Sequence, residues 1–149
     1  MVATVAFTGM EHLVGGTGID TFEFLQVGDD ITGSVSGGDG GDIFQVGSGV
    51  TLSTASGLSG DAGNDEFTLA DGSGVTNGVA GGDNDDVFNV NGAVTANLSG
   101  EAGNDDFVFA DGAVLTGNID GGLGEDTLDW SDYQSEVQVT IVPDGGSLE

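Results

Sequence analysis

Lysine and arginine are absent from this sequence, whereas aspartate and glutamate together number 26 in 149 residues. With a single histidine, the formal net charge at pH 7 is -26, and no ion pair to a lysine or arginine can neutralise the carboxylates. Repulsion of this size expands a chain unless cations compensate for it. Nucleic acid and anionic membranes are therefore poor partners, because proteins bind both through basic patches.

Cysteine is also absent, which excludes disulfides, thiolate metal sites and thiol catalysis. No apolar run is long enough to span a bilayer, so we expect no membrane insertion. Met1 to Thr4 lacks the basic start of a signal peptide, and we expect any export signal on a larger parent chain. We interpret residues 148–149 as a cloning remnant and leave them out of the fold.

Glycine is abundant instead, with 30 residues, and it recurs with a period. A ten-residue motif is written six times, beginning at Gly15, Gly37, Gly60, Gly81, Gly100 and Gly121. Its sixth position is always aspartate: Asp20, Asp42, Asp65, Asp86, Asp105 and Asp126. Successive copies begin 19 to 23 residues apart, and a period this short predicts the stacked coils of a solenoid.

Apolar residues keep the same period. The eighth position of the motif holds Phe22, Phe44, Phe67, Phe88, Phe107 and Leu128, and the position two before the motif holds Leu13, Val35, Leu58, Val79, Leu98 and Ile119. Each repeat is predicted to form two strands and two turns, and the phenylalanines are predicted to form an internal ladder. The predicted fold is all-β: a right-handed parallel β-helix or β-roll of six to seven coils of about 21 residues.

The chain is divided accordingly. Residues 1–14 are expected to form an incomplete N-terminal coil that begins with a strand at 2–7, and residues 15–130 the six-repeat solenoid. Residues 131–147 are expected to form a cap with a strand at 137–142, to which Trp130 and Tyr133 contribute packing. The third repeat is about two residues longer than its neighbours, which predicts a bulge near Ser53 to Ser56.

The glycine turns are the candidate chemical site. Glycines at the first and fourth positions allow left-handed backbone, so carbonyl oxygens can converge. The sixth-position carboxylates would stack at about 5 Å and repel one another, and a hard divalent cation between turns would remove that repulsion. An all-oxygen ligand set favours Ca²⁺ over zinc or copper. Metal-free turns remain an alternative, because aspartate also closes turns through its own backbone.

GGDGGDIFQ, GGTGIDTFE and GGLGEDTLD resemble the nonapeptide GGxGxDxUx of the repeats-in-toxin (RTX) family, in which U is a large apolar residue. The resemblance covers Gly15 to Trp130 and implies a β-roll with Ca²⁺ held between consecutive turns. The expected ligands are the six aspartates and six first-position glycines already named, together with Asp39 and Asp83. Here each nonapeptide is followed by a longer segment, so we expect one row of about five ions and not two. Asp61 and Glu101 replace the second glycine and leave the backbone there in question.

The pattern also resembles the β-strand repeats of very large bacterial secreted and surface proteins. It implies a calcium-binding structural segment of an adhesin-like protein, secreted or on the cell surface, acting as a spacer or adhesion scaffold. Partners would be calcium ions and either neighbouring solenoid segments end to end or an unknown surface ligand. Catalysis is not expected, because His12 and Tyr133 lie at opposite ends of the rod. An ice-binding or other surface-binding solenoid is the alternative, using a threonine file at Thr32, Thr51, Thr76, Thr95 and Thr116.

Overall fold

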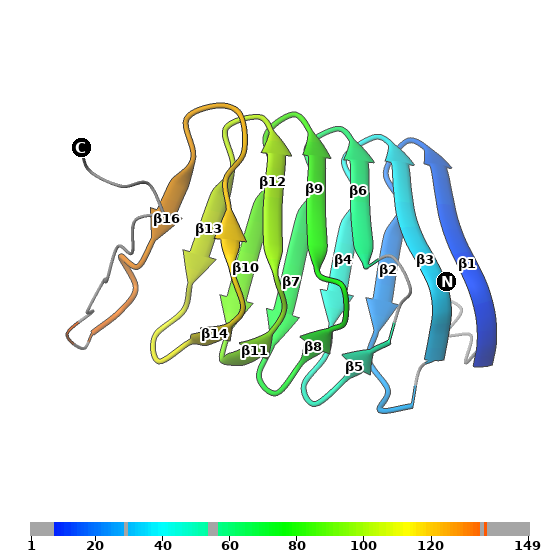
Figure 1. The fold of residues 1–149 in the computed structure, drawn as a ribbon, viewed down its shortest axis with the longest axis horizontal. Coiled ribbons are helices and arrows are strands. Elements are labelled where there is room, and N and C mark those ends of the chain that lie inside the picture. Colours follow the sequence, from blue (N-terminus) through cyan, green and yellow to red (C-terminus); the bar gives the residue numbers. More distant parts are fainter. Residues whose placement is uncertain (1–7, 29, 54–56, 135, 137–149) are drawn as a thin grey trace, which may run out of the picture.

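A computed structural model describes residues 8–28, 30–53, 57–134 and 136, and all the regular elements in this part of the chain are β-strands. The strands stack into a rod in which the chain passes from sheet to sheet in each coil (Figure 1). The fold is a parallel β-solenoid of about 5 turns of ~21 residues, so the predicted class is confirmed and the predicted six to seven coils are slightly too many. The described residues include no helix that could span a membrane.

Three parallel sheets form the walls of the rod. Sheet A contains β1 (Thr8–Thr17), β3 (Asp30–Asp39), β6 (Leu58–Ala62), β9 (Val79–Asp83), β12 (Leu98–Ala102) and β15 (Ile119–Asp120). Sheet B contains β2 (Thr21–Phe24), β4 (Ile43–Val46), β7 (Glu66–Ala70), β10 (Val87–Asn91), β13 (Asp106–Phe109) and β16 (Thr127–Asp129). Sheet C is shorter and contains β5 (Thr51–Leu52), β8 (Gly74–Val75), β11 (Ala93–Thr95) and β14 (Val114–Thr116).

The third sheet corrects the prediction of two strands per repeat. In the first two coils β1 and β3 each run unbroken for 10 residues and continue into the first residues of the glycine motif, where we predicted a turn. In later coils the same stretch divides between sheets C and A. Between β8 and β9 the two strands are separated by a turn that includes Asn77 and Gly78, with backbone φ angles of 68° and 87°. An Asn-Gly pair is a turn signal, because both residues tolerate left-handed backbone.

The core is built from stacked apolar columns. Phe22, Phe44, Phe67, Phe88 and Phe107 stack with ring centroids 4.7–5.0 Å apart and planes within 13° of parallel, so the predicted ladder is confirmed. Each ring covers its neighbour, since no single coil can bury its own apolar face. The column two residues before the motif also pairs in register, as Val35 does with Leu58 and Leu98 with Ile119.

The C-terminal end of the rod is partly covered, as predicted. Trp130 and Tyr133 pack against the core, and the ring centroids of Phe109 and Trp130 are 5.5 Å apart. The hydroxyl of Tyr133 donates a hydrogen bond to the carbonyl of Ala113. The strands predicted at 2–7 and 137–142 lie outside the described residues, as do residues 54–56 of the bulge predicted near Ser53 to Ser56.

Candidate functional site

The sixth-position aspartates form a file along one edge of the rod, between sheets A and B. Asp42, Asp65, Asp86 and Asp105 are at most 1% exposed, whereas Asp20 is half-buried and Asp126 is exposed, because these two lie in the end coils. The register of sheet B places each aspartate beside the next, since it pairs Phe44 with Phe67 and Phe67 with Phe88. The structure therefore brings together the six residues that the sequence singled out.

From Asp42 onward, one carboxylate oxygen of each aspartate accepts a hydrogen bond from the preceding coil. The backbone N–H of Asp65 donates to Oδ1 of Asp86 at 2.8 Å, and that of Asp86 donates to Oδ1 of Asp105 at 2.9 Å. The same bond recurs at the other steps of the file, to Asp42, Asp65 and Asp126, at 2.6–3.1 Å. This ladder ties each coil to the next through a side chain as well as through the sheets.

The second carboxylate oxygen is buried without a hydrogen-bond partner. This holds for Oδ2 of Asp42, Asp65, Asp86 and Asp105. Oδ2 of Asp86 lies against Gly81, the first residue of its own motif, and the carbonyl oxygen of Gly100 approaches the same place from the next coil. A Cβ on Gly81 would have both oxygens within 2.9 Å. The arrangement repeats five times: Oδ2 of aspartates 20, 42, 65, 86 and 105 and the carbonyl oxygens of glycines 37, 60, 81, 100 and 121 lie, pair by pair, around the space that a Cβ on the first-position glycine would take.

The first-position glycines are needed for space and not for backbone conformation. We predicted left-handed backbone at the first and fourth positions, but positive φ occurs at the second and fourth. The replacements at those positions adopt it too: Asp61 and Glu101 have φ of 74°, and Asn84 has φ of 79°. Gly81 has no positive φ, and a side chain there would collide with the Asp86 carboxylate. The prediction was therefore wrong for the first position and right for the fourth.

The electrostatics of the file follow from burial. Burial raises the pKa of Asp65 to about 6 and that of Asp86 to about 7, from 3.8, although the backbone N–H bonds oppose the shift. The negative charges of Asp42 and Asp61 raise the pKa of Asp65 further. Those of Asp65, Asp105 and Asp85 do the same for the pKa of Asp86. The pKa of Asp105 is raised for the same main reason. The carboxylates of Asp65, Asp86 and Asp105 thus favour a proton or a cation over the bare ionised form.

Asp39 and Asp83, also expected as ligands, are exposed. Ala62 lies between them in sheet A, since it pairs in register with Asp39 on one side and with Asp83 on the other. The two aspartates are therefore not in neighbouring coils. Within the described ranges no group of three or more histidine, cysteine, aspartate or glutamate side chains is placed to hold a metal. A cation in the file would therefore depend on backbone carbonyls for much of its coordination.

A second ladder, on the exposed side of the same turns, was not anticipated. The backbone N–H of Asn104 donates to Oδ1 of Asp85 at 2.8 Å, and that of Glu125 donates to Oδ1 of Asn104 at 3.0 Å. These residues occupy the fifth position of the motif, where Asn64 also lies. The recurrence of Asn and Asp at the fifth position of the motif is the sequence feature that could have predicted this second ladder.

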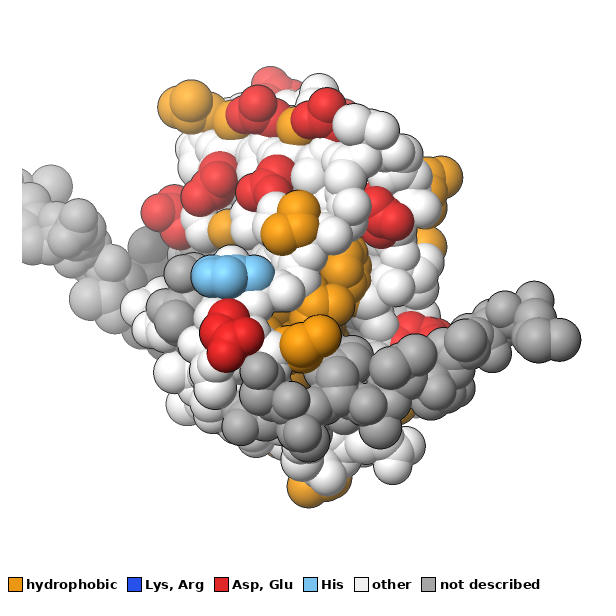
Figure 2. Space-filling view, turned by 90° about the vertical axis from the view of Figure 1, so that its right-hand side faces the viewer, with side chains coloured by type: hydrophobic (Ala, Val, Ile, Leu, Met, Phe, Trp, Pro, Cys, Tyr) orange, Lys and Arg blue, Asp and Glu red, His pale blue; other side chains and the backbone are white. Residues whose placement is uncertain are grey.

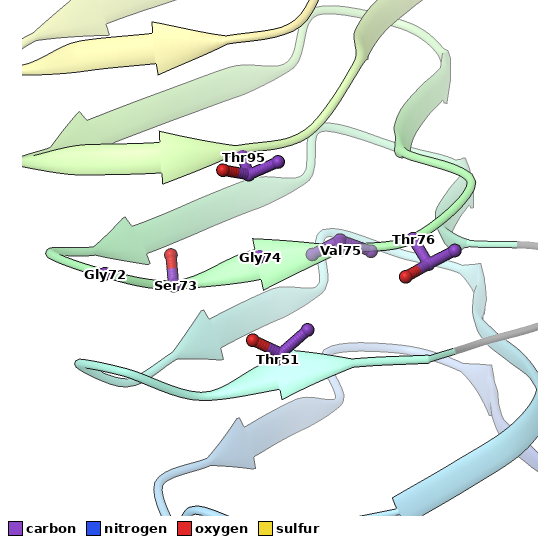
Figure 3. Close-up of a pocket in the computed structure, with 7 residues that line it drawn as sticks. All are labelled: Thr51, Gly72, Ser73, Gly74, Val75, Thr76 and Thr95. Atoms are coloured by element: carbon purple, nitrogen blue, oxygen red, sulfur yellow. The ribbon is translucent and has the colours of Figure 1, made fainter.

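The proposed threonine file is interrupted. Thr51 and Thr95 both pair with Gly74, and Thr95 pairs with Thr116, whereas Thr76 follows the end of β8. A pocket of about 280 Å³ lies at this interruption (Figure 3). The pocket is lined by Thr51, Gly72, Ser73, Gly74, Val75, Thr76 and Thr95, none of which carries an acid or base for catalysis at neutral pH.

Comparisons with protein-family models, with curated proteins and with solved structures found no match to this chain.

Proposed function

We propose that this chain is a calcium-stabilised structural β-solenoid, a stiff segment of a protein that works outside the cell or on a bacterial cell surface. The observation that carries the proposal is the recurrent pair of acceptor oxygens in the turns, a carboxylate Oδ2 and a carbonyl oxygen of the next coil that both lie against the first-position glycine. A carboxylate oxygen that is buried without a donor, close to another acceptor, is stabilised by a cation or a proton.

Calcium fits this donor set. Carboxylate and carbonyl oxygens are the ligands that Ca²⁺ takes, and its coordination tolerates irregular geometry. The sixth-position aspartates would supply the charged oxygens and the first-position glycines the carbonyl oxygens. Bound calcium would neutralise the carboxylates, for which the chain has no lysine or arginine. The chain's own contribution is to hold the oxygens in line, through the Oδ1 ladder and the close approach that each glycine permits.

A metal-free solenoid is the second candidate. It is favoured by the Oδ1 ladder, which needs no ion, and by the raised pKa of Asp65 and Asp86, which favours a protonated Oδ2. A proton on Oδ2 could be donated to the neighbouring carbonyl. In both cases the chain is a scaffold, and we assign it no catalytic activity.

A calcium titration of EDTA-treated protein separates the two candidates. Circular dichroism and calorimetry would follow folding and melting temperature, with magnesium chloride as the control for ionic strength. Extracellular calcium modules have dissociation constants of about 0.1–1 mM. At ten times the dissociation constant each site contributes about 1.4 kcal/mol, so several sites should raise the melting temperature by many degrees. An unchanged melting temperature would reject the calcium proposal.

Asp86→Asn tests the site itself. The amide keeps the Oδ1 acceptor and can donate to the Gly100 carbonyl, so in EDTA this variant should be at least as stable as the parent. In calcium it should lose the contribution of about one site. Asp85→Asn is the matched control, because it removes the same charge from an exposed neighbour. Equal calcium responses of the two variants would contradict the assignment of Asp86 as a ligand.

A further inference from the structure

The two ends of the rod differ from its interior in their exposed apolar side chains. Met10, Val14, Ile19, Leu25 and Val27 of the first coil are exposed, as are Val114, Leu123 and Leu128 of the last. The described coils between them expose no large hydrophobic side chain. Figure 2 looks onto the N-terminal end, where hydrophobic side chains lie among acidic ones and the single histidine. Exposure of this kind, confined to the ends, indicates surfaces suited to contact with another coil.

The edge strands are open in a complementary way. Within the described chain no strand pairs with the outer edge of β1 or β2 at one end, or of β15 or β16 at the other. All sheets are parallel and run in the same order, so the C-terminal edge of one rod has the hydrogen-bonding pattern that the N-terminal edge of another requires. Such edges are templates for strand addition.

The aspartate ladder is incomplete at both ends. Every interior step joins a backbone N–H to Oδ1 of the next aspartate. Among the described residues, no backbone N–H donates to the carboxylate of Asp20, since no described turn precedes it. At the other end Asp126 accepts from Asp105, but no described carboxylate lies ahead of its own N–H. Within the part of the chain that the structure describes, one end therefore lacks a donor, and the other lacks the matching acceptor.

The column of stacked core side chains is also exposed at its C-terminal end. Leu128 pairs in register with Phe107 and continues the column of stacked rings, yet it is 42% exposed, whereas the interior rings are at most 1% exposed. Docking the N-terminal edge of a second rod would place Phe22 over Leu128 and Leu13 beside Ile119. These contacts repeat the ones that join every pair of coils inside the rod.

We propose that a second copy of this chain docks end to end, with β1 and β2 of one copy pairing with β15 and β16 of the other, and with Asp126 N–H donating to the carboxylate of Asp20. The interface is head to tail and therefore open, so it builds filaments and not closed dimers. Both ends carry acidic residues, so association should increase with salt as the repulsion is screened. This proposal does not depend on calcium binding.

Cross-linking tests the direction of docking. The register that runs along sheet B places Thr21 of one copy next to Thr127 of the other. Because the chain has no cysteine, Thr21→Cys and Thr127→Cys each introduce a single thiol. Under mild oxidation of an equal mixture, in any buffer where circular dichroism shows a folded chain, the mixed disulfide should exceed either homodimer by at least about tenfold. A random mixture or an excess of homodimers would overturn the proposal. Glu66→Cys, in the same outward column of an interior coil, should stay at background level.

Sedimentation of Asp20→Ala tests the ladder contact. The variant removes the acceptor and also one negative charge, so weaker repulsion alone would strengthen association. Loss of the hydrogen bond predicts the opposite, with association in EDTA and about 0.5 M NaCl falling several-fold. Thr95→Ala, on an exposed position of an interior coil, should associate like the parent. Association of Asp20→Ala at or above the parent level would overturn the contact.

Discussion

Ser73 occupies a core position that neighbouring coils fill with valine. Because Gly74 pairs with Thr51 and with Thr95, the residue before it lies level with Val50 and Val94. Its hydroxyl is buried and has no hydrogen-bond partner. Nothing in the sequence singled it out, because Gly-Ser-Gly is typical of a turn. Its inward position depends on the register between coils.

Replacing this serine should stabilise the protein. An unsatisfied buried hydroxyl costs about 1–3 kcal/mol, and a valine would continue the apolar column. Ser73→Val should therefore raise the free energy of unfolding in urea by about 1–2 kcal/mol. Ser73→Ala is the control, which removes the hydroxyl without adding volume. A valine variant less stable than the alanine variant would mean that the column has no room.

At the scale of the turn, the first-position glycine controls the distance between coils. Gly81 lies where Asp86 Oδ2 and the Gly100 carbonyl come together, and a Cβ there would lie 2.9 Å from that carbonyl. Gly74 in β8 is the contrasting case, since its Cβ would meet only ordinary contacts of 3.4 to 3.7 Å. The same substitution should therefore have different results at the two sites.

Gly81→Ala should destabilise the rod by about 1–3 kcal/mol, because the carboxylate or the next coil must move. Gly74→Ala should change the unfolding free energy by less than about 1 kcal/mol, and it can be slightly stabilising because alanine restricts the unfolded chain. Chemical denaturation of both variants under the same conditions measures the difference. Similar losses at the two positions would show that backbone flexibility, and not space, explains the glycine in the turn.

For the whole molecule, charge and pH are coupled through the buried file. The pKa of Asp65 is raised to about 6 and that of Asp86 to about 7, against 3.8 for an ordinary aspartate, so the folded chain binds protons more tightly than the unfolded one. The resulting stabilisation is complete below about pH 3.8 and is lost as the pH rises through 6 and 7. Because an aspartate or glutamate in a model peptide is ionised above about pH 5, a change of stability above that pH reports on carboxylates with raised pKa values.

In EDTA the melting temperature should therefore fall between pH 5 and 7.5, and Asp86→Asn should reduce that slope because the amide does not titrate. In calcium the slope should be smaller or reversed, since binding requires ionised carboxylates. Calorimetry across this range measures both effects. A melting temperature in EDTA that stays constant or rises from pH 5 to 7.5 would contradict the raised pKa values.

The sequence alone determined the solenoid, its parallel sheets, its phenylalanine ladder and its file of aspartates. These follow from a period of about 21 residues, because a residue repeated at that interval stacks on its own copies whatever the details of the coil. The packing of Trp130 and Tyr133 against the core was predictable because these two large aromatic residues lie at the end of the last repeat and just after it.

Only the tertiary structure decided how each coil is divided among the three sheets and which atoms of successive coils are in contact. The third sheet, the departure of Thr76 from the threonine file and the inward position of Ser73 depend on the register between coils of 19 to 23 residues. The roles of the two carboxylate oxygens and of the first glycine depend on contacts between successive coils. Spacing along the chain fixes which residues are neighbours, but it does not fix distances or orientations, and these decide what the neighbours do.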